Sequence, residues 1–201
     1  MQTRNTKKLV GVSMLAAVAF VLMFFAFPII PGVTFLKIDF SDIPVLLGMF
    51  LYGPVAGIAV AVIRTILHYV QTGGDAGYPI GDTASLIASL AYTLPIYYIM
   101  NAKAEKAKTV ILANVLGTVS LTTVLSLLNA YVLIPLYFLV LNFSVGPIQK
   151  YVFYGVVPFN LIKGIIVSTV FVALYKKMKP WIIKNQVSQL TDDRYLTLEK
   201  K

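Results

Sequence analysis

Five long apolar stretches make up most of this chain, and short polar segments separate them. They cover residues 9–30, 43–70, 83–100, 109–141 and 152–175. A helix needs about 20 apolar residues to cross the hydrocarbon of a bilayer. Inside that hydrocarbon every backbone N–H and C=O group must be hydrogen-bonded within the protein, which a helix achieves by itself. The pattern therefore predicts an all-α integral membrane protein.

The second stretch, residues 43–70, is too long for one membrane span and too short for two. It contains Gly53 followed by Pro54, a pair that is typical of turns. Proline is well tolerated in the first turn of a helix, where its missing N–H group leaves no bond unmade. We therefore expect a short half-span over residues 43–52 and a return helix over residues 54–70.

The fourth stretch, residues 109–141, is also long, but Lys108 and Pro135 frame it as one helix with a bent outer end. The first stretch follows basic residues, as in a signal peptide. Its length and the apolar stretches behind it favour a retained span. The sequence thus predicts a bundle of six transmembrane helices in one domain over residues 1–180. A polar tail over residues 181–201 is expected to be poorly ordered.

The basic residues gather in three places: before the first apolar stretch, in the loop that follows residues 83–100, and after the last stretch. These residues are Arg4, Lys7, Lys8, Lys103, Lys106, Lys108, Lys176, Lys177, Lys179 and Lys184. With an even number of crossings all three groups lie on one face, which the positive-inside rule makes cytoplasmic. We therefore expect both termini in the cytoplasm and a multi-pass protein of the cell membrane. The net charge of +9 is then a topology signal and predicts no nucleic-acid partner.

The composition leaves little material for catalysis. Only 12% of the residues are charged, whereas a soluble domain carries about a quarter. The chain has no cysteine, one histidine and eight carboxylates, so a disulfide framework or a thiolate metal site is excluded and a histidine cluster cannot form. We expect no catalytic residues, no metal site and no enzymatic activity.

Five polar residues lie inside the expected spans, where lipid tolerates them poorly. They are Arg64, His68, Asn129, Asn160 and Lys163. At about 1.5 Å of rise per residue, Asn129 lies near the outer edge of the hydrocarbon, and Asn160 and Lys163 lie about 9 to 14 Å inward from that side. Asn160 and Lys163 are three residues apart and therefore share a helix face. These three side chains are expected to meet in a pocket in the outer half of the bundle.

A purely structural interpretation of the same residues remains open. Asn129 and Asn160 could hydrogen-bond between helices, and Lys163 could extend toward the lipid headgroups. Arg64 and His68 could each pair with one of three aspartates near the helix ends, which are Asp39, Asp42 and Asp82. The common depth of Asn129, Asn160 and Lys163 favours a solute-binding site.

The residue types around this pocket indicate the kind of solute. An asparagine side chain both donates and accepts hydrogen bonds, and a lysine donates three. Aromatic rings are expected nearby, and they can sandwich a flat ligand: Phe35, Phe40, Tyr131, Phe138, Tyr154 and Phe159. Residues 31–41 form an apolar outer loop suited to cover the pocket. This combination favours a planar, uncharged heterocycle rich in amide groups, although aromatic residues such as Phe138 and Tyr154 are also ordinary at a membrane interface.

Two groups of motifs resemble a known family. The run LKIDFSDIP over residues 36–44, followed by YGPVAG over residues 52–57, resembles the substrate-binding S components of energy-coupling-factor (ECF) vitamin transporters. The runs LNAY over residues 128–131 and PFNLIKG over residues 158–164 resemble the riboflavin-specific branch of that family. The similarity covers about residues 8–180.

This resemblance implies a function and a set of partners. It implies high-affinity riboflavin capture on the outer face and inward delivery together with a transmembrane coupling subunit and two ATPase subunits. Riboflavin is then the transported ligand, and no cofactor is expected. By likeness, the substrate-binding residues are Leu36, Asp39, Phe40, Asn129, Asn160 and Lys163. Family members also carry small residues four apart on the first helix as a partner interface, and Ser13 and Ala17 correspond to them here.

Two other functional classes fit the sequence less well. A membrane-embedded enzyme would need paired carboxylates or a Ser/Lys dyad, but the carboxylates lie near loops. A self-sufficient secondary transporter of a small planar solute would show internal repeats or a charged relay across the membrane. The polar groups instead stop in the outer half, which favours a binding subunit driven by other proteins.

Overall fold

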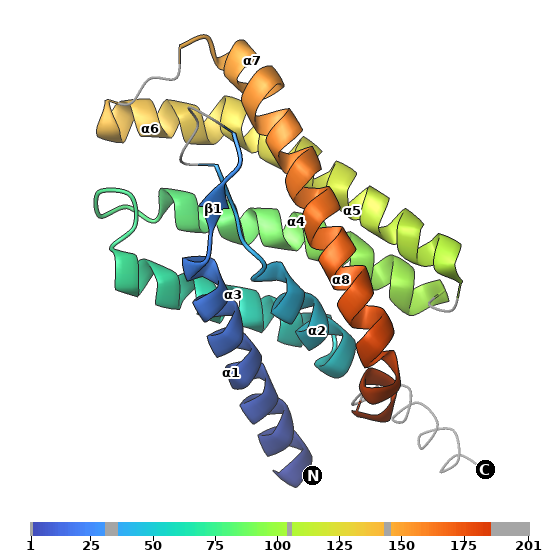
Figure 1. The fold of residues 1–201 in the computed structure, drawn as a ribbon. Helices are drawn as coiled ribbons and strands as arrows, with labels where there is room; N and C mark the ends of the chain where they lie inside the picture. The colour runs from blue at the N-terminus through green and yellow to red at the C-terminus, as the bar shows by residue number, and fades with distance from the viewer. Residues whose placement is uncertain (1, 31–35, 104–105, 143–145, 186–201) are drawn as a thin grey trace, which may run out of the picture.

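We analysed a computed structural model of the chain, which describes residues 2–30, 36–103, 106–142 and 146–185. Figure 1 shows a bundle of long helices with one small pair of strands at one end. In chain order the first elements are α1 (Gln2–Phe24), β1 (Phe27–Pro28), β2 (Lys37–Ile38), α2 (Asp42–Tyr52), α3 (Pro54–Thr72) and α4 (Ile80–Lys103). They are followed by α5 (Ala107–Leu128), η1 (Asn129–Leu133), α6 (Ile134–Leu141), α7 (Ile148–Tyr151), η2 (Val152–Val156) and α8 (Val157–Asn185).

The expected all-α membrane bundle is confirmed. Among the described residues, five helical runs are long and apolar enough to cross a membrane, namely 5–24, 54–72, 80–101, 107–141 and 148–185. The sixth helix, α2, has 11 residues and is too short to cross alone. The helix α8 continues through Asn185, and the rest of the expected tail lies outside the described residues.

The predicted break in the second apolar stretch is confirmed at Gly53. Its φ of +91° is a backbone conformation that glycine adopts without steric penalty. The N–H group of Gly53 closes α2 by donating to the carbonyl of Met49, and Pro54 begins α3. One residue therefore ends one helix and allows the next to begin.

The two longest helical runs each contain a π-helical turn. In the first run η1 joins α5 to α6, and in the second η2 joins α7 to α8. Figure 1 shows α6 running in a different direction from α5, so the predicted bent end of the fourth stretch is observed. Such single π-turns inside α-helices frequently occur at functional sites.

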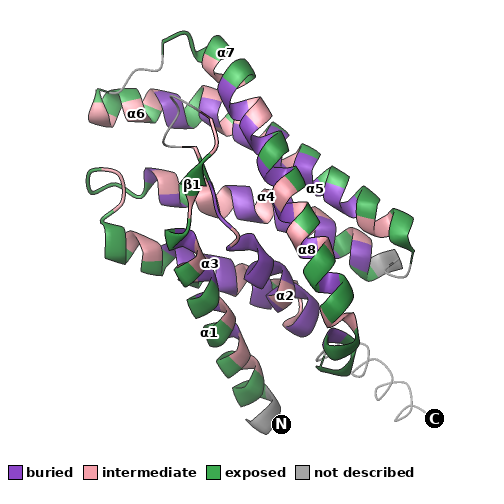
Figure 2. Ribbon diagram, viewed as in Figure 1, coloured by how far each residue is buried: buried purple, intermediate pink, exposed green. Residues whose placement is uncertain are grey.

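Buried residues line the centre of the bundle, whereas residues on the outward faces of the long helices are exposed (Figure 2) and mostly apolar. The helix α2 packs against α1, α3, α4 and α8, while α4 lies along α5 and α5 lies along α8. Exposed aliphatic residues on the outward faces include Leu9, Val18, Ile66, Leu116 and Leu139. An apolar exterior of this extent suits a surrounding of lipid.

The strands β1 and β2 pair in antiparallel fashion, with Phe27 opposite Ile38 and Pro28 opposite Lys37. This pairing fixes the segment that leaves α1 against the segment that enters α2. The expected covering loop, residues 31–41, is described only from residue 36 onward. We refer to the end of the bundle that carries this pair as the β-pair end.

Candidate ligand-binding cavity

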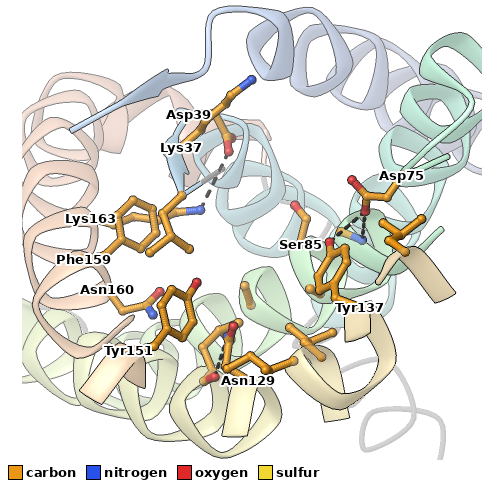
Figure 3. A pocket seen from close by; sticks show the side chains of 18 residues that line it. Lys37, Asp39, Asp75, Ser85, Asn129, Tyr137, Tyr151, Phe159, Asn160 and Lys163 are labelled. Carbon is orange, nitrogen blue, oxygen red and sulfur yellow. Dashed lines mark hydrogen bonds and ion pairs between the residues drawn. The ribbon is translucent and has the colours of Figure 1, made fainter. Parts of the chain in front are cut away.

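A cavity of about 460 Å³ opens near the β-pair end. Its walls come from β2 and the residues on either side of it, from the α3–α4 turn and the start of α4, from α5 to α6, and from α7 and α8 (Figure 3). Drug-sized ligands occupy pockets of about 300–1,000 Å³, so this cavity has room for a small organic molecule.

Five of the six residues expected at the binding site line this cavity: Leu36, Asp39, Asn129, Asn160 and Lys163. They come from three separate parts of the chain, and Figure 3 shows Lys163 and Asn160 on one wall with Asn129 beside them. The sixth, Phe40, is half-buried, packs against the hydrophobic core and is not among the lining residues.

The two asparagines are held in the same way. The Nδ2 group of Asn129 donates to the carbonyl of Leu125 at 2.8 Å, and that of Asn160 donates to the carbonyl of Val156 at 2.8 Å. A side-chain amide has two donor hydrogens and one acceptor oxygen. Each side chain therefore keeps one N–H and its oxygen for a further partner. Asn129 is the first residue of η1, and Asn160 follows η2 closely, so both π-turns lie at the cavity wall.

Lys163 and Asp39 form an ion pair across the cavity, with 3.8 Å between Nζ and Oδ2. Burial alone would raise the pKa of Asp39. The positive charges of Lys163 and Arg64, together with hydrogen bonds from Ser41, outweigh that effect and lower the pKa below 3.8. The pair therefore places a carboxylate and an ammonium group side by side at the cavity wall.

Asp75 and Tyr137 close the other side of the cavity. Asp75 Oδ2 accepts hydrogen bonds from the Tyr137 hydroxyl at 2.8 Å and from the Gly81 N–H at 2.7 Å. This contact ties the α3–α4 turn to α6. Sequence analysis missed both residues, since no local pattern indicates a contact between positions so far apart in the chain. Tyr137 and Tyr151 both line the cavity.

Other aromatic residues expected around the ligand lie elsewhere. Tyr131, Phe138 and Tyr154 are 76%, 55% and 73% exposed on the outside of the helices, as interfacial aromatic residues are. Phe35 lies outside the described residues. Phe159 is buried and does line the cavity.

The two basic residues of α3 each contact an aspartate, as the structural interpretation allowed. Arg64 Nη2 lies 3.1 Å from Asp42 Oδ1, and His68 Nδ1 lies 2.6 Å from Asp82 Oδ1. Neither Arg64 nor His68 lines the cavity. Arg64 is 1% exposed, so its charge is enclosed within the protein.

The small residues of α1 divide between two faces. Ser13 and Ala17 are exposed, whereas Ala16 and Ala19 are buried in the core. The pair expected at a partner interface therefore lies on the outside of the bundle, where small side chains let another helix approach closely.

The chemistry of the cavity suits binding. Its polar atoms can donate to and accept from a neutral ligand, and its apolar part offers Leu36, Leu125, Leu133 and Phe159 to a flat ring. Within the part of the chain that the structure describes, no group of three or more His, Cys, Asp or Glu side chains could hold a metal ion.

Comparison with known proteins gives concordant matches in sequence and structure. The family model described as "ECF transporter, substrate-specific component" matches residues 7–175. The riboflavin transporter FmnP of Bacillus subtilis (strain 168) is 42% identical over 182 residues, which cover 89% of this chain and 95% of that protein. The riboflavin transporter RibU of Staphylococcus aureus (strain TCH60) is 40% identical over 177 residues, covering 87% of this chain and 92% of that protein.

A solved structure of the S component of a bacterial ECF transporter has the same fold. It superimposes with a TM-score of 0.75 and 39% sequence identity, and the match covers 89% of this chain and 98% of that chain.

Proposed function

This chain belongs to the family of substrate-specific components of ECF transporters, and from that premise we propose that it is the high-affinity riboflavin-binding subunit of a vitamin uptake transporter. The relatives at 42% and 40% identity are named riboflavin transporters. Membership of this family makes the chain a transport component and not an enzyme. The observation that carries the choice of ligand is the convergence of Asn129, Asn160, Lys163 and Asp39 on one cavity.

Riboflavin matches the groups that this cavity offers. Its ring system is planar and carries a row of carbonyl and N–H groups, which the side chains of Asn129 and Asn160 can pair with and to which Lys163 can donate. Phe159 and Leu36 supply apolar surface for the ring faces. Asp39 can accept hydrogen bonds from hydroxyl groups of the ribityl chain.

The proposal includes an orientation in the membrane. Figure 1 shows the first turn of α1 and the last turns of α8 at the end of the bundle away from β1 and α7. The basic residues of these two helix ends, with Lys106 and Lys108 before and within α5, favour the cytoplasm for that end. Both termini are then cytoplasmic, and the cavity opens to the outside of the cell membrane. Residues 1–180 act as one membrane domain, with residues 181–201 as a cytoplasmic tail.

Transport itself requires an energy source. Two ATPase subunits and a transmembrane coupling subunit, shared with other transporters of this kind, would carry the loaded chain through its inward-opening step. The cavity near the β-pair end holds Asp39, Asn129, Asn160 and Lys163, which supports capture by this chain and energisation by others.

The direct test of ligand choice is a titration of riboflavin fluorescence with detergent-purified protein. Stacking of the ring against the cavity wall should quench the fluorescence stoichiometrically, and unlabelled competitors of different shape should fail to restore it. A linear response without saturation would contradict riboflavin as the ligand.

Riboflavin affinity is expected to stay constant from about pH 8 to about pH 5, since Asp39 remains ionised over that range. The pKa of this carboxyl group is lowered in the folded protein, so its contribution is present above the unfolded value and is lost only as the pH falls through the lower, folded value. Calorimetric titration at several pH values checks this.

The same titration with His68→Gln serves as the control, because this variant contains no histidine. A loss of affinity between about pH 6 and pH 5 in this variant would show that Asp39 is protonated there, contrary to the expectation.

Replacing Ser13 or Ala17 by leucine is expected to abolish uptake without changing riboflavin affinity. Both side chains are exposed on α1 and neither lines the cavity, and a larger side chain would keep a partner helix from approaching. Uptake of labelled riboflavin into vesicles containing the complete complex measures the effect. Val18→Leu, at an exposed position on another side of the same helix, is the matched control, and normal uptake by the Ser13 and Ala17 variants would place the interface elsewhere.

A further inference from the structure

Arg64 is a buried charge that the cavity itself does not use. It lies on α3 with 1% of its surface exposed and is absent from the cavity wall. A guanidinium group enclosed in a membrane protein is costly, and such residues are retained where they act in a structure or a site. The contacts of Arg64 lead from α3 to the ligand position.

The guanidinium group has two partners. Its Nη2 lies 3.1 Å from Asp42 Oδ1 at the start of α2, and its Nη1 donates to the hydroxyl oxygen of Ser41. Ser41 in turn donates twice to Asp39 Oδ1, from its hydroxyl group and from its backbone N–H at 2.8 Å. The other oxygen of Asp39, Oδ2, faces Lys163 Nζ at 3.8 Å.

The direction of these hydrogen bonds follows from the chemistry of the groups. A guanidinium group can only donate, so the Ser41 oxygen must accept from Arg64. A serine hydroxyl has a single hydrogen, and with Arg64 in place this hydrogen is directed to Asp39. The hydrogen bonds therefore run in one direction, from Arg64 to Ser41 and from Ser41 to Asp39, and Asp39 is also paired with Lys163.

If Arg64 only neutralised Asp42, its second contact, with Ser41, would not be needed. A single N–H group of Arg64 suffices for the pair with Asp42, yet a second one reaches Ser41. The four charged residues, two cations and two carboxylates, are each at least nine-tenths buried: Asp39 8% exposed, Asp42 2%, Arg64 1% and Lys163 8%. In an enclosed cluster of this kind the orientation of one member depends on the others.

Building on the proposed function, we propose that Arg64 is a positioning residue for the ligand: acting through Ser41, it fixes Asp39 so that Lys163 is held in the cavity ready to bind. Arg64 does not touch the ligand. Its effect on binding passes through Asp39, and this can be measured as coupling between the two residues.

A double-mutant cycle in riboflavin binding tests the coupling. Arg64→Met is expected to weaken affinity about tenfold in the otherwise unchanged chain and less than about twofold when Asp39 is already replaced by asparagine. Thr93→Val is the control for general packing effects. Thr93 is buried on α4, and its hydroxyl group donates to the carbonyl of Ser89 in the same helix. If the effects of Arg64→Met and Asp39→Asn simply multiply, the two residues act independently and the proposal is wrong.

A second variant separates positioning from charge balance. Arg64→Met leaves Asp42 as an unpaired buried carboxylate, which can impair folding. The double substitution Arg64→Met with Asp42→Asn removes both charges of the pair and keeps the cluster neutral. We expect this variant to fold and to retain the tenfold loss. Return of its affinity to the unmodified value would show that Arg64 merely neutralises Asp42, and would overturn the proposal.

A third measurement needs no ligand. The charged groups around Asp39 are Lys163 from α8, Arg64 from α3, Asp42 from α2, Lys37 from β2 and, across the cavity, Asp75. Without Arg64 the carboxyl group of Asp39 should become protonated at higher pH. Because the pKa of Asp39 is then less depressed, Arg64→Met is expected to lose less stability than the unmodified chain as the pH falls below about 4. The variant that also carries Asp39→Asn lacks this carboxyl group and its contribution.

Identical pH profiles for these three proteins would overturn the proposal. Failure of the unmodified chain to bind riboflavin would instead contradict the proposed function, and the ligand-free profiles would still decide the role of Arg64.

Discussion

Replacing Lys163 by methionine is expected to weaken riboflavin binding about a hundredfold. Methionine keeps most of the length and apolar volume of the lysine stem and removes only the amine. The ligand then loses a charged donor, and Asp39 Oδ2 loses its partner at 3.8 Å. Truncating one member of a buried charge pair at a binding site costs about 2–5 kcal/mol, and each 1.4 kcal/mol corresponds to about a factor of ten in affinity.

The measurement is a fluorescence titration of the purified variant, with Lys150→Met as the matched control. Lys150 lies on α7 near the same end of the bundle, is exposed and does not line the cavity. Asn129→Ala and Asn160→Ala remove neutral hydrogen bonds and should each weaken binding by a smaller factor, about threefold to tenfold. If Lys163→Met and Asn129→Ala both bind riboflavin as the unmodified chain does, the ligand occupies another site.

A change in folding has to be separated from a change in binding in this experiment. The double substitution Asp39→Asn with Lys163→Met removes both charges and leaves no unpaired carboxylate at the cavity. We expect this variant to unfold at nearly the temperature of the unmodified chain and still to bind riboflavin weakly. Recovery of full affinity in it would mean that Lys163 serves only to neutralise Asp39.

Replacing Gly57 by leucine is expected to destabilise the fold by about 2 kcal/mol or more. At Gly57 α3 lies directly against α2: a Cβ atom there would lie 2.1 Å from Met49 Cγ, 2.8 Å from the carbonyl oxygen of Val45 and 3.0 Å from the backbone nitrogen of Met49. The Met49 side chain can rotate away, but the two backbone atoms move only if α2 moves as a whole. The gain from replacing a helical glycine, about 1 kcal/mol, does not offset this clash.

The displacement would also reach the ligand position, because α2 begins at Asp42 directly after the Asp39–Ser41 segment. Thermal unfolding in detergent, followed by the fluorescence of Trp181, checks the prediction. Val55→Leu is the matched control, since Val55 lies on the same helix and is 73% exposed. An unchanged unfolding temperature for Gly57→Leu would show that α2 and α3 are not held at the separation described here.

Much of the fold could be predicted from the sequence because lipid imposes simple rules. The length of each apolar stretch gave the helices, and Gly53-Pro54 gave the boundary between α2 and α3, which the structure confirms. The rise of a helix per residue was enough to place Asn129, Asn160 and Lys163 at a common depth, and all three line one cavity. Depth depends only on counting residues along a helix.

The direction in which side chains point around each helix was harder to predict. Each residue advances the helix by about 100°, so a π-turn, which inserts one residue, rotates everything beyond it. The turns η1 and η2 precede α6 and α8, and the sequence carries no recognisable signal for either. Tyr137 therefore faces the cavity whereas Phe138 faces outward, as the interfacial alternative for Phe138 allowed.

Contacts between distant segments were also beyond the sequence pattern. Arg64 was recognised as costly in a membrane span, and Asp42 was one of three candidate partners. The continuation through Ser41 to Asp39 requires the turn between β2 and α2, whose geometry depends on how α2 packs into the bundle. The bond between Asp75 and Tyr137 likewise exists only once α6 has bent over the α3–α4 turn.

The most direct test of riboflavin capture by this cavity is the visible absorption spectrum of the protein as purified in detergent from cells grown with riboflavin, recorded beside that of Lys163→Met. We predict that the unmodified protein carries the two flavin absorption bands at close to one flavin per chain, and that Lys163→Met is nearly colourless at equal yield. A colourless unmodified protein that also leaves the fluorescence of added riboflavin unchanged would contradict the proposed ligand.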